Sequence, residues 1–372
     1  MMKKAKVLFY TNIPSPYRVD FFNELGKKCD LTVLFELKNS NERDKEWDKY
    51  NFINFRGIFM KGIRLNTDTA FCPSVIRHIN KTYDQVIISY IGSPTACLMA
   101  WILKHKKIPY YFEGDGGFAG SIKGIKAYLK RYIISNAEMC LSTSKEFDKY
   151  CLMYGACPDK ILRYPFTSVK EKEVLSNIKT PLEKSKLRNE LGMQERGIII
   201  SVGQFIHRKG FDLLLAMSKE LKEDIGVYII GGTPTEEYLE MCKKWNLQHV
   251  HFLPFMNKER LNMYYQAADV FAFFTREDIW GLVICEAMAN GLPVVSSDRC
   301  LAATEMITND VNGYIVQNEN LSEMKRAIDK IMKSEQIRQK MSKNAIQLIR
   351  NKYTIEKMAE SHLKIFDENR VG

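Results

Sequence analysis

Asp278–Pro293 reads DIWGLVICEAMANGLP. The pattern predicts a helix over 281–290, because Gly291 is a suitable left-handed cap and Pro293 cannot continue a helix. A predicted strand precedes this helix, so the helix begins at the carboxyl end of a strand. The unpaired amides of such a first turn attract an anion, and Gly281 allows the backbone to approach a ligand closely.

Short apolar runs alternate with helical patterns on both sides of this stretch. The expected strands are 6–10, 31–35, 85–90, 108–113, 198–202, 227–230, 251–252, 270–274 and 293–296. The expected helices are 95–105, 182–191, 211–221, 236–245, 258–267 and 281–290, with a helical tail from about 321. Such alternation predicts an α/β fold of parallel sheets that helices cover on both faces.

The alternation lapses at residues 164–180, where proline, hydroxyl residues and mixed charges replace it. We place a domain boundary there, which gives a first domain over 1–168, a second over 169–352 and a terminal helix over 353–372. Each domain is expected to be a Rossmann-like, doubly wound unit. Ligands of such sheets bind beyond the carboxyl ends of the strands, here in a cleft between two facing domains.

The net charge of +11 is unevenly placed, since residues 1–168 carry 26 Lys and Arg against 16 Asp and Glu. This basic half suits a polyanion or an anionic membrane surface, and a solvated basic surface without a partner is the alternative. Nine cysteines without a CxxC pair favour a reduced, cytosolic protein. We expect no metal, because the six histidines are scattered, and no membrane-spanning helix, because no apolar run approaches ~20 residues.

Two carboxylates frame the predicted helix. Asp278 precedes it, and Glu286 projects from its otherwise apolar interior. A buried ionised carboxylate needs partners, and the two hydroxyls of a ribose would satisfy Glu286. The alternative is that Glu286 lies on an exposed stripe and that Asp278 is a simple helix cap.

The same stretch resembles the E-x7-E segment of family 4 glycosyltransferases with the GT-B fold, in the variety E-D-x-W-G-L-V-x-x-E-A-M-A-x-G-L-P-V. The resemblance is firm over residues 197–316 and looser over 1–168. It implies that Glu286 holds the donor ribose and that Asp278, where the general motif has Glu, contacts the transferred sugar. The backbone amides that would face the donor diphosphate are those of Gly281, Leu282 and Val283.

A second stretch, Ser201–Gly210, reads SVGQFIHRKG and is similar to the family pattern V-G-R-x-x-x-x-K-G. The resemblance implies that Gly203 opens the turn and that Lys209 clasps the diphosphate. Gln204 occupies the usual Arg position, which removes one charge from the expected clamp. Arg208 is the candidate that restores it, and an exposed basic pair is the alternative.

The donor base is expected against Gly232, Phe252 and Leu253, which correspond to family segments ending in G-x-G and F-x-G. Negative charge builds on the departing diphosphate during sugar transfer, and fixed cations and helix-end amides stabilise that charge. Because no convincing DxD pair occurs, we expect a metal-free reaction. No cofactor is expected besides the nucleotide-diphosphate sugar as co-substrate.

On the acceptor side, a predicted strand leads into EGDGGFAG at residues 113–120. So many glycines at a strand end indicate close approach by a ligand or a sharply turning loop, and Gly116 and Gly117 are acceptor-contact candidates. Related enzymes often carry a His here, and this chain has none. Glu113 and Asp115 are therefore the candidates to position the acceptor or to act as a base, with a structural turn as the alternative.

Two further segments belong to the acceptor side. Tyr17 and Arg18 lie in the expected loop after the first strand and are candidates for acceptor contact. Ser121–Asn136 reads SIKGIKAYLKRYIISN, in which basic and apolar residues interleave as in a short basic amphipathic helix. This helix predicts contact with an anionic membrane surface, and packing of its apolar stripe on the core is the alternative.

Residues and resemblance together predict a retaining, metal-independent glycosyltransferase that moves a sugar from a nucleotide-diphosphate donor to an acceptor hydroxyl. The acceptor would be a lipid-linked or cell-surface glycan precursor, bound by the first domain, with the donor on the second and the terminal helix crossing back to the first. The catalytic candidates are Asp278, Lys209, Arg208, Asp115 and Glu113. We expect a cytoplasmic protein, peripheral on the inner face of the membrane, that binds no nucleic acid.

Two other functions remain open at the level of sequence. One is a different enzyme of the same fold, such as a nucleotide-sugar epimerase or a phosphorylase. The other is a non-catalytic, nucleotide-sugar-binding partner subunit, which would fit the missing Arg at Gln204.

Overall fold

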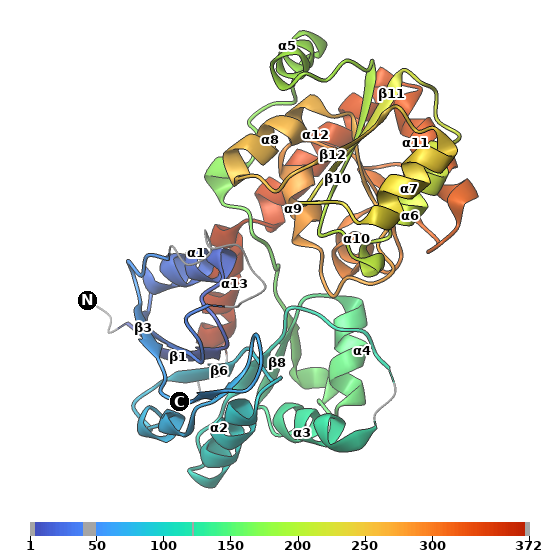
Figure 1. The fold of residues 1–372 in the computed structure, drawn as a ribbon. Coiled ribbons are helices and arrows are strands. Elements are labelled where there is room, and N and C mark those ends of the chain that lie inside the picture. Colours follow the sequence, from blue (N-terminus) through green and yellow to red (C-terminus); the bar gives the residue numbers. More distant parts are fainter. Residues whose placement is uncertain (1–3, 40–49, 121–122, 369–372) are drawn as a thin grey trace. The chain divides into compact units, whose positions relative to one another are not determined.

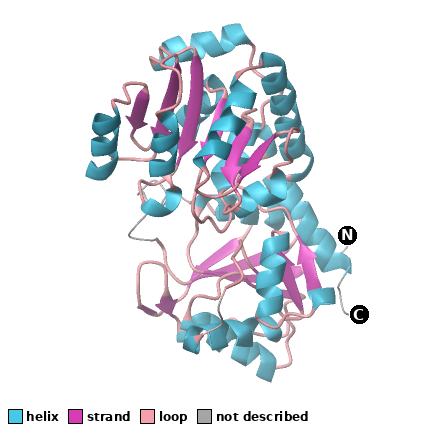
Figure 2. Cartoon of the chain, turned by 90° about the vertical axis from the view of Figure 1, so that its right-hand side faces the viewer, coloured by secondary structure: helices cyan, strands magenta, loops and turns pink. Residues whose placement is uncertain are grey.

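The computed structural model describes residues 4–39, 50–120 and 123–368. The chain divides into two compact units, one formed by residues 1–168 with 354–372 and the other by residues 169–353. Each unit contains one main parallel β-sheet with helices on both of its faces (Figure 1, Figure 2). The predicted α/β class with two Rossmann-like units is confirmed.

The first unit holds a parallel sheet in the order β3-β2-β1-β6-β7-β8-β9. Its strands are β1 (Lys6–Thr11), β2 (Asp30–Phe35), β3 (Arg56–Phe59), β6 (Gln85–Ile88), β7 (Tyr111–Glu113), β8 (Met139–Ser142) and β9 (Ile161–Arg163). Its helices are α1 (Pro16–Gly26), α2 (Pro94–His105), α3 (Gly124–Ser135), α4 (Lys145–Met153) and α13 (Ile355–Glu368). A short antiparallel pair, β4 (Ile63–Arg64) and β5 (Ala70–Phe71), forms a separate small sheet.

The last helix of the chain completes the first unit. Helix α13 packs against α1, and its His362 ring lies 4.8 Å from the ring of Phe21. Met358, Ile365 and Phe366 of the same helix are buried. The apolar face of α13 therefore covers the same side of the sheet as α1 (Figure 1).

The second unit holds a parallel sheet in the order β12-β11-β10-β13-β14-β15. Its strands are β10 (Gly197–Val202), β11 (Ile225–Ile230), β12 (Val250–Leu253), β13 (Val270–Phe273), β14 (Val294–Ser297) and β15 (Gly313–Val316). Its helices are α5 (Pro181–Leu191), α6 (Phe211–Ser218), α7 (Glu236–Trp245), α8 (Lys258–Ala267), α9 (Leu282–Ala289), α10 (Leu301–Met306), α11 (Leu321–Met332) and α12 (Glu335–Lys352). The core strands are apolar along their whole length because helices cover both faces of the sheet.

Long periodic elements match the expected ones better than short elements do. Helices α7 and α8 have the predicted bounds, whereas β8, β9, β15, α4 and α10 were not expected. A separate difference concerns the segment after β1, which was expected to be a loop. Pro16 occupies the first turn of α1, where its missing amide costs nothing, so Tyr17 and Arg18 lie in a helix.

Candidate active site

The loop after β10 packs against the end of the neighbouring strand, β13. β10 ends at Val202, and a single helical turn, His207–Lys209, leads into Gly210. Gly210 has φ +67°, and a Cβ there would lie 2.0 Å from the carbonyl oxygen of Phe274. Glycine is therefore required for this loop to pack against the end of β13.

Hydrogen bonds join this loop to the segment that follows β13. Arg276 donates to the carboxylate of Asp212 at 2.8 and 2.6 Å and to the carbonyl oxygen of His207 at 2.9 Å. The guanidinium of Arg208 donates to the carbonyl oxygen of Glu277 at 2.6 Å. These hydrogen bonds join residues 207–212 to residues 276–277, which lie far from them in the sequence. They therefore fix the position of the loop.

Lys209 and Asp278 form an ion pair within this arrangement. The distance from Lys209 Nζ to Asp278 Oδ2 is 2.6 Å, and the two side chains are 14% and 11% exposed. The ammonium also lies 5.1 Å from the ring centre of Phe273. Because an ammonium has three donors, a ligand oxygen can bind Lys209 while Asp278 remains close.

Helix α9 begins beside this ion pair. Its cap, Gly281, has φ +98°, and a Cβ there would lie 2.6 Å from Cys300 Sγ. The amides of Gly281, Leu282 and Val283 donate to no described residue, as is usual for the first turn of a helix. The positive end of the α9 dipole therefore adjoins Lys209 and Asp278.

Glu286 lies five residues beyond Gly281 on the same helix and is half-buried. Burial raises the pKa of the Tyr265 hydroxyl well above its ordinary value, and the charge of Glu286 adds to this shift. Burial likewise raises the pKa of the Cys300 thiol, and Asp278 adds to that shift. Both neighbours therefore stay uncharged at neutral pH.

The remaining donor-side candidates lie at the same carboxyl edge of the sheet. Gly203 donates its amide to the carbonyl of Ile230 at 2.9 Å, and a Cβ on Gly231 would lie 1.7 Å from the Gly203 carbonyl oxygen. The Gly231 amide donates to the carbonyl of Leu253 at 3.2 Å. Gly232 follows with φ +115° and has no atom within 4 Å of a built Cβ.

The side chains of this group differ in exposure. Gln204 is exposed, and Leu253 is half-buried at the end of β12. Phe252 is half-buried and packs edge-to-face on Phe205 at 5.5 Å. Four of these candidates therefore lie at one edge of the sheet: Gly203, Gln204, Gly232 and Leu253. Phe252 also packs against Phe205 in the loop that follows β10.

On the first unit, Glu113 is fully buried at the end of β7. Arg18 of α1 forms an ion pair with one carboxylate oxygen, and His362 Nε2 of α13 lies 2.8 Å from the other. Burial alone would raise the pKa of Glu113, but Arg18 and His362 outweigh it and lower the pKa from 4.5 to about 2. Glu113 is thus an ionised carboxylate that joins α1, β7 and α13.

Asp115 is the more accessible acceptor-side carboxylate, with 29% of its side chain exposed, and it also pairs with Arg18. Gly116 has φ +146°, and a Cβ on Gly117 would lie 3.2 Å from the ring of Tyr150. Tyr17 is half-buried against Phe166, with ring centres 5.7 Å apart. Arg18 is itself buried, so its contacts in the structure are with protein groups.

His362 was not foreseen from the sequence. A single histidine on an amphipathic helix carries no local signal, and its partner Glu113 lies 249 residues away in the chain. Among the described residues, no group of three or more His, Cys, Asp or Glu could hold a metal ion.

Part of the second unit matches a known protein family. Residues 183–348 match the family model of glycosyl transferases, group 1. The matched segment contains every donor-side candidate from Gly203 to Glu286 and none of the acceptor-side candidates.

Two relatives are similar to this chain in sequence. An uncharacterised glycosyltransferase of Methanocaldococcus jannaschii is 28% identical over 241 residues, which cover 63% of this chain and 61% of that protein. The GDP-mannose-dependent alpha-(1-6)-phosphatidylinositol monomannoside mannosyltransferase of Mycolicibacterium smegmatis is 29% identical over 164 residues, covering 41% of this chain and 43% of that protein. The chain thus spans between about two fifths and three fifths of these relatives' lengths.

The solved structures extend the likeness of fold to nearly the whole chain. HepE of Anabaena, crystallised with UDP and glucose, superposes with a TM-score of 0.74 at 15% identity and covers 98% of this chain and 99% of that one. The fold of this chain is of the GT-B type, with two Rossmann-like units.

Proposed function

We propose that this protein is a retaining, metal-independent glycosyltransferase that moves a sugar from a nucleotide-diphosphate donor to an acceptor hydroxyl. The observation that carries the proposal is the convergence of Lys209, Asp278 and the start of α9 at Gly281. The match of residues 183–348 to the group 1 family covers this site.

The site residues divide the work of the reaction. Lys209 and the first-turn amides of α9 bind the diphosphate, and their fixed positive charge stabilises it most when the bond to the anomeric carbon breaks. Arg208 supplies the second cation that Gln204 does not. Asp278 orients the transferred sugar, and Glu286 binds the ribose.

The nature of the donor is supported by what the similar proteins bind. The Anabaena structure contains UDP and glucose, and the Mycolicibacterium enzyme is described as GDP-mannose-dependent. Both are nucleotide-diphosphate systems, and their bases differ. The proposal therefore covers the class of donor and leaves its base to the experiment below.

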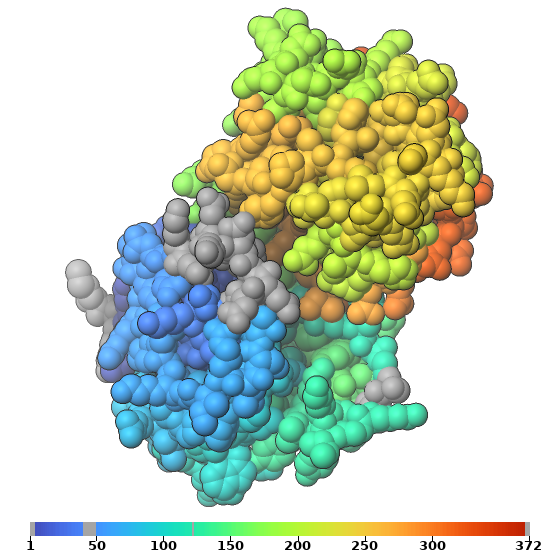
Figure 3. Space-filling model, viewed as in Figure 1, coloured from blue at the N-terminus to red at the C-terminus, as the bar shows by residue number. Residues whose placement is uncertain are grey.

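We further propose that the acceptor is a lipid-linked or cell-surface glycan precursor, approached from the cytoplasmic face of a membrane. Helix α3 exposes 79% of Ile125 and 69% of Tyr128 beside the exposed Lys123 and Lys126. Residues 123–135, blue-green in Figure 3, lie at the surface of the first unit. Ser121 and Ile122, the first residues of the predicted amphipathic segment, lie outside the described residues.

Two observations bear on the membrane. The Mycolicibacterium relative is named for a phosphatidylinositol monomannoside substrate, which is a lipid-linked glycan. Within the described part of the chain, no helix has both the length and the apolar character needed to cross a bilayer. The proposed contact is therefore peripheral and uses the mixed apolar and basic surface of α3.

The direct test begins with thermal shifts against UDP-, GDP-, ADP- and dTDP-sugars, because a ligand that binds the folded state raises its stability. With the best donor, Lys209→Ala should lower transfer by at least about 10²-fold, the range for removing one charge-stabilising donor. Glu286→Ala should also lower transfer, through loss of the ribose contact. Lys243→Ala, an exposed lysine on α7, is the matched control and should retain activity.

The outcomes separate this function from its alternatives. Turnover at the wild-type rate in Lys209→Ala would contradict the site assignment. Donor binding without transfer to any acceptor would support a non-catalytic subunit, and turnover of donor without acceptor would support an epimerase. Activity should persist in EDTA, and the anomeric configuration of the product, read by NMR, should match that of the donor.

A further inference from the structure

A cavity of about 890 Å³ lies at the amino edge of the sheet in the second unit. It is lined by the start of β10 at Gly197, the start of β11 at Ile225, and Asp269 immediately before β13. The Lys209 loop follows the opposite, carboxyl end of β10. The two ends of β10 are about 17 Å apart, so the cavity and the Lys209 loop lie at opposite ends of the strand.

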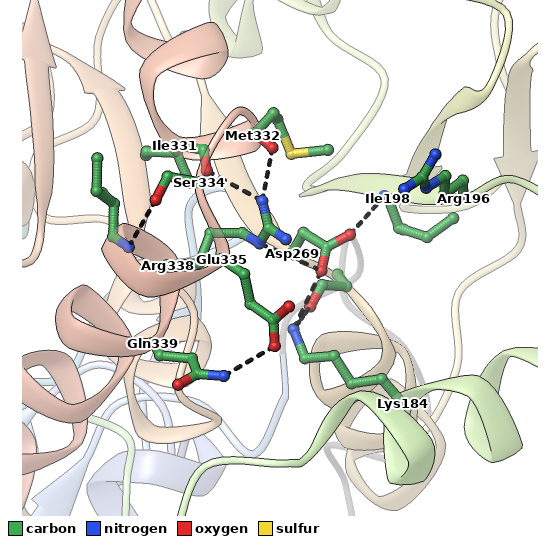
Figure 4. A network of polar contacts seen from close by, with 12 residues as sticks. Lys184, Arg196, Ile198, Asp269, Ile331, Met332, Ser334, Glu335, Arg338 and Gln339 are labelled. Carbon is green, nitrogen blue, oxygen red and sulfur yellow. Dashed lines mark hydrogen bonds and ion pairs between the residues drawn. The ribbon is translucent and has the colours of Figure 1, made fainter.

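Three cations converge on one carboxylate inside the cavity. Lys184, Arg188 and Arg338 reach Asp269 at 3.3, 2.8 and 3.9 Å. Figure 4 shows Lys184 and Arg338 approaching Asp269 from different helices. Asp269 also accepts the amide of Ile198 at 2.9 Å, and burial, which alone would raise its pKa, is outweighed by the cations, which lower it.

The other partners of these cations are neutral carbonyl groups. Arg188 donates to the carbonyls of Ala267 and Arg196 at 2.9 and 2.8 Å, and Arg338 donates to that of Met332 at 2.6 Å. Carbonyl oxygens satisfy the donors without cancelling their charge. The cluster of Lys184, Arg188, Arg338 and Asp269, the Asp269 cluster, therefore carries an excess of two positive charges.

The rest of the lining increases this excess. Eight lysines and arginines and five aspartates and glutamates line the cavity, a formal net charge of +3. Arg196, Lys222 and Lys333 form no ion pair with any residue that the structure describes. Burial lowers the pKa of Lys184, and although Asp269 opposes this shift, Arg188 adds to it. The lining of the cavity therefore carries more positive than negative charge.

One buried polar group of the cavity lacks a hydrogen-bond partner among the described residues. Tyr265 lines the cavity and is fully buried, and its hydroxyl has no hydrogen-bond partner within the described part of the chain. Helix α5 has no buried residue; it packs against α8, and Lys184 and Arg188 join it to the sheet edge. The first turn of α12 also adjoins the cavity, through the carboxylate of Glu335 and the guanidinium of Arg338.

We propose that this cavity binds a small anion of the phosphate class carrying two or more negative charges. The Asp269 cluster and the cations at its rim, Arg196 and Lys333, would hold it through charge-assisted hydrogen bonds. Binding would neutralise the excess charge and fix α5 against the sheet edge. This inference is independent of the proposed transferase activity.

The test is calorimetric titration of the full chain with inorganic pyrophosphate at constant ionic strength, followed by hydrogen exchange. Lys184→Met, and the double variant Arg196→Met with Lys333→Met, should weaken binding by about tenfold or more because each removes a charge-assisted contact. The double variant leaves the ion pairs of the Asp269 cluster in place, so it is expected to fold. Hydrogen exchange of the backbone amides should slow in α5 and in the first turn of α12 when pyrophosphate binds.

Two controls decide where the anion binds and whether simple charge attracts it. Lys243→Met with Lys244→Met removes the same charge from α7 and should leave binding unchanged. Lys209→Met removes the donor-site cation and should leave protection of α5 unchanged. No binding by the wild type, loss of binding in Lys209→Met alone, or equal weakening in the α7 control would each overturn the proposal.

Discussion

Glu113 is a carboxylate without exposed surface that stays ionised because two side chains from other elements meet it. Arg18 comes from α1 and His362 from α13, and His362 Nδ1 lies 2.8 Å from the carbonyl oxygen of Met358. A buried charge is tolerated only when its partners satisfy it, and breaking such a group leaves uncompensated charge behind. The stability of the first unit should therefore depend on this one residue.

We predict that Glu113→Gln lowers the free energy of unfolding by about 3–5 kcal/mol, the range for breaking a buried ion pair by removing one partner. Urea denaturation measures the change. Glu138→Gln is the control, since the Glu138–Lys160 pair is exposed and should contribute less than about 1 kcal/mol. An equal effect of both substitutions would show that burial of the Glu113 pair is unimportant.

The same residue has a defined pH dependence. The pKa of Glu113 in the fold is about 2, below its ordinary value of 4.5. A lowered folded-state pKa stabilises the protein above about pH 4.5, and this contribution is lost as the pH falls toward 2. The stability difference between the wild type and Glu113→Gln, measured by urea denaturation, should accordingly stay constant from pH 6 to about 4.5 and shrink below that pH, and a difference that grows there would contradict the assignment.

At the scale of elements, the donor site depends on how two loops and a helix start pack together. Gly210, Gly231 and Gly281 stand where a Cβ would lie 1.7 to 2.6 Å from another atom. Such positions let backbone pass close to backbone or to a buried thiol. The close packing around Gly281 sets where the first-turn amides of α9 lie.

We predict that Gly281→Ala reduces both stability and donor binding. The substitution combines φ +98° with a contact of 2.6 Å to Cys300 Sγ, and backbone strain alone costs about 1–3 kcal/mol. Gly192→Ala is the matched control, because Gly192 has φ +72° and no atom within 4 Å of its built Cβ. Thermal shifts with and without donor should show lost donor stabilisation in Gly281→Ala only, and equal donor shifts in both variants would refute a role for this turn.

At the scale of the whole molecule, charge is concentrated in the first half of the chain. Residues 1–168 carry most of the net charge of +11, and α3 adds exposed apolar side chains to that basic surface. A basic surface with apolar side chains attracts an anionic bilayer and can insert into its interface. The second unit has its excess cations in the cavity at Asp269 instead.

We predict that the protein binds vesicles of phosphatidylglycerol and phosphatidylcholine more tightly than vesicles of phosphatidylcholine alone, and that salt weakens this binding. Ile125→Asp with Tyr128→Asp should lower binding at least about tenfold, since burial of one large apolar side chain contributes about 1.5–3 kcal/mol. Ile76→Asp, an exposed isoleucine elsewhere on the unit, is the control for sedimentation assays. Equal loss in all variants would exclude α3 as the contact.

Local sequence was sufficient for the fold class and for most long elements. The apolar runs of β10, β11 and β13 and the helical patterns of α7 and α8 are periodic within a few residues, so their type can be read without tertiary contacts. The turn at Gly203–Gly210 and the helix start at Gly281 were expected together because both stretches resemble donor-binding motifs of one family. Short elements such as β9 and α10 contain too few residues for a period to appear.

The tertiary structure alone decided which distant side chains meet. Lys209 pairs with Asp278 across 69 residues, Asp269 with Lys184 across 85, and Glu113 with His362 across 249. Ion pairs of this kind depend on strand order and helix packing, which a local pattern does not encode. Sequence therefore determined the class of fold and the chemistry available at each loop, whereas packing determined which charges are paired, which are buried, and where positive charge remains for a ligand.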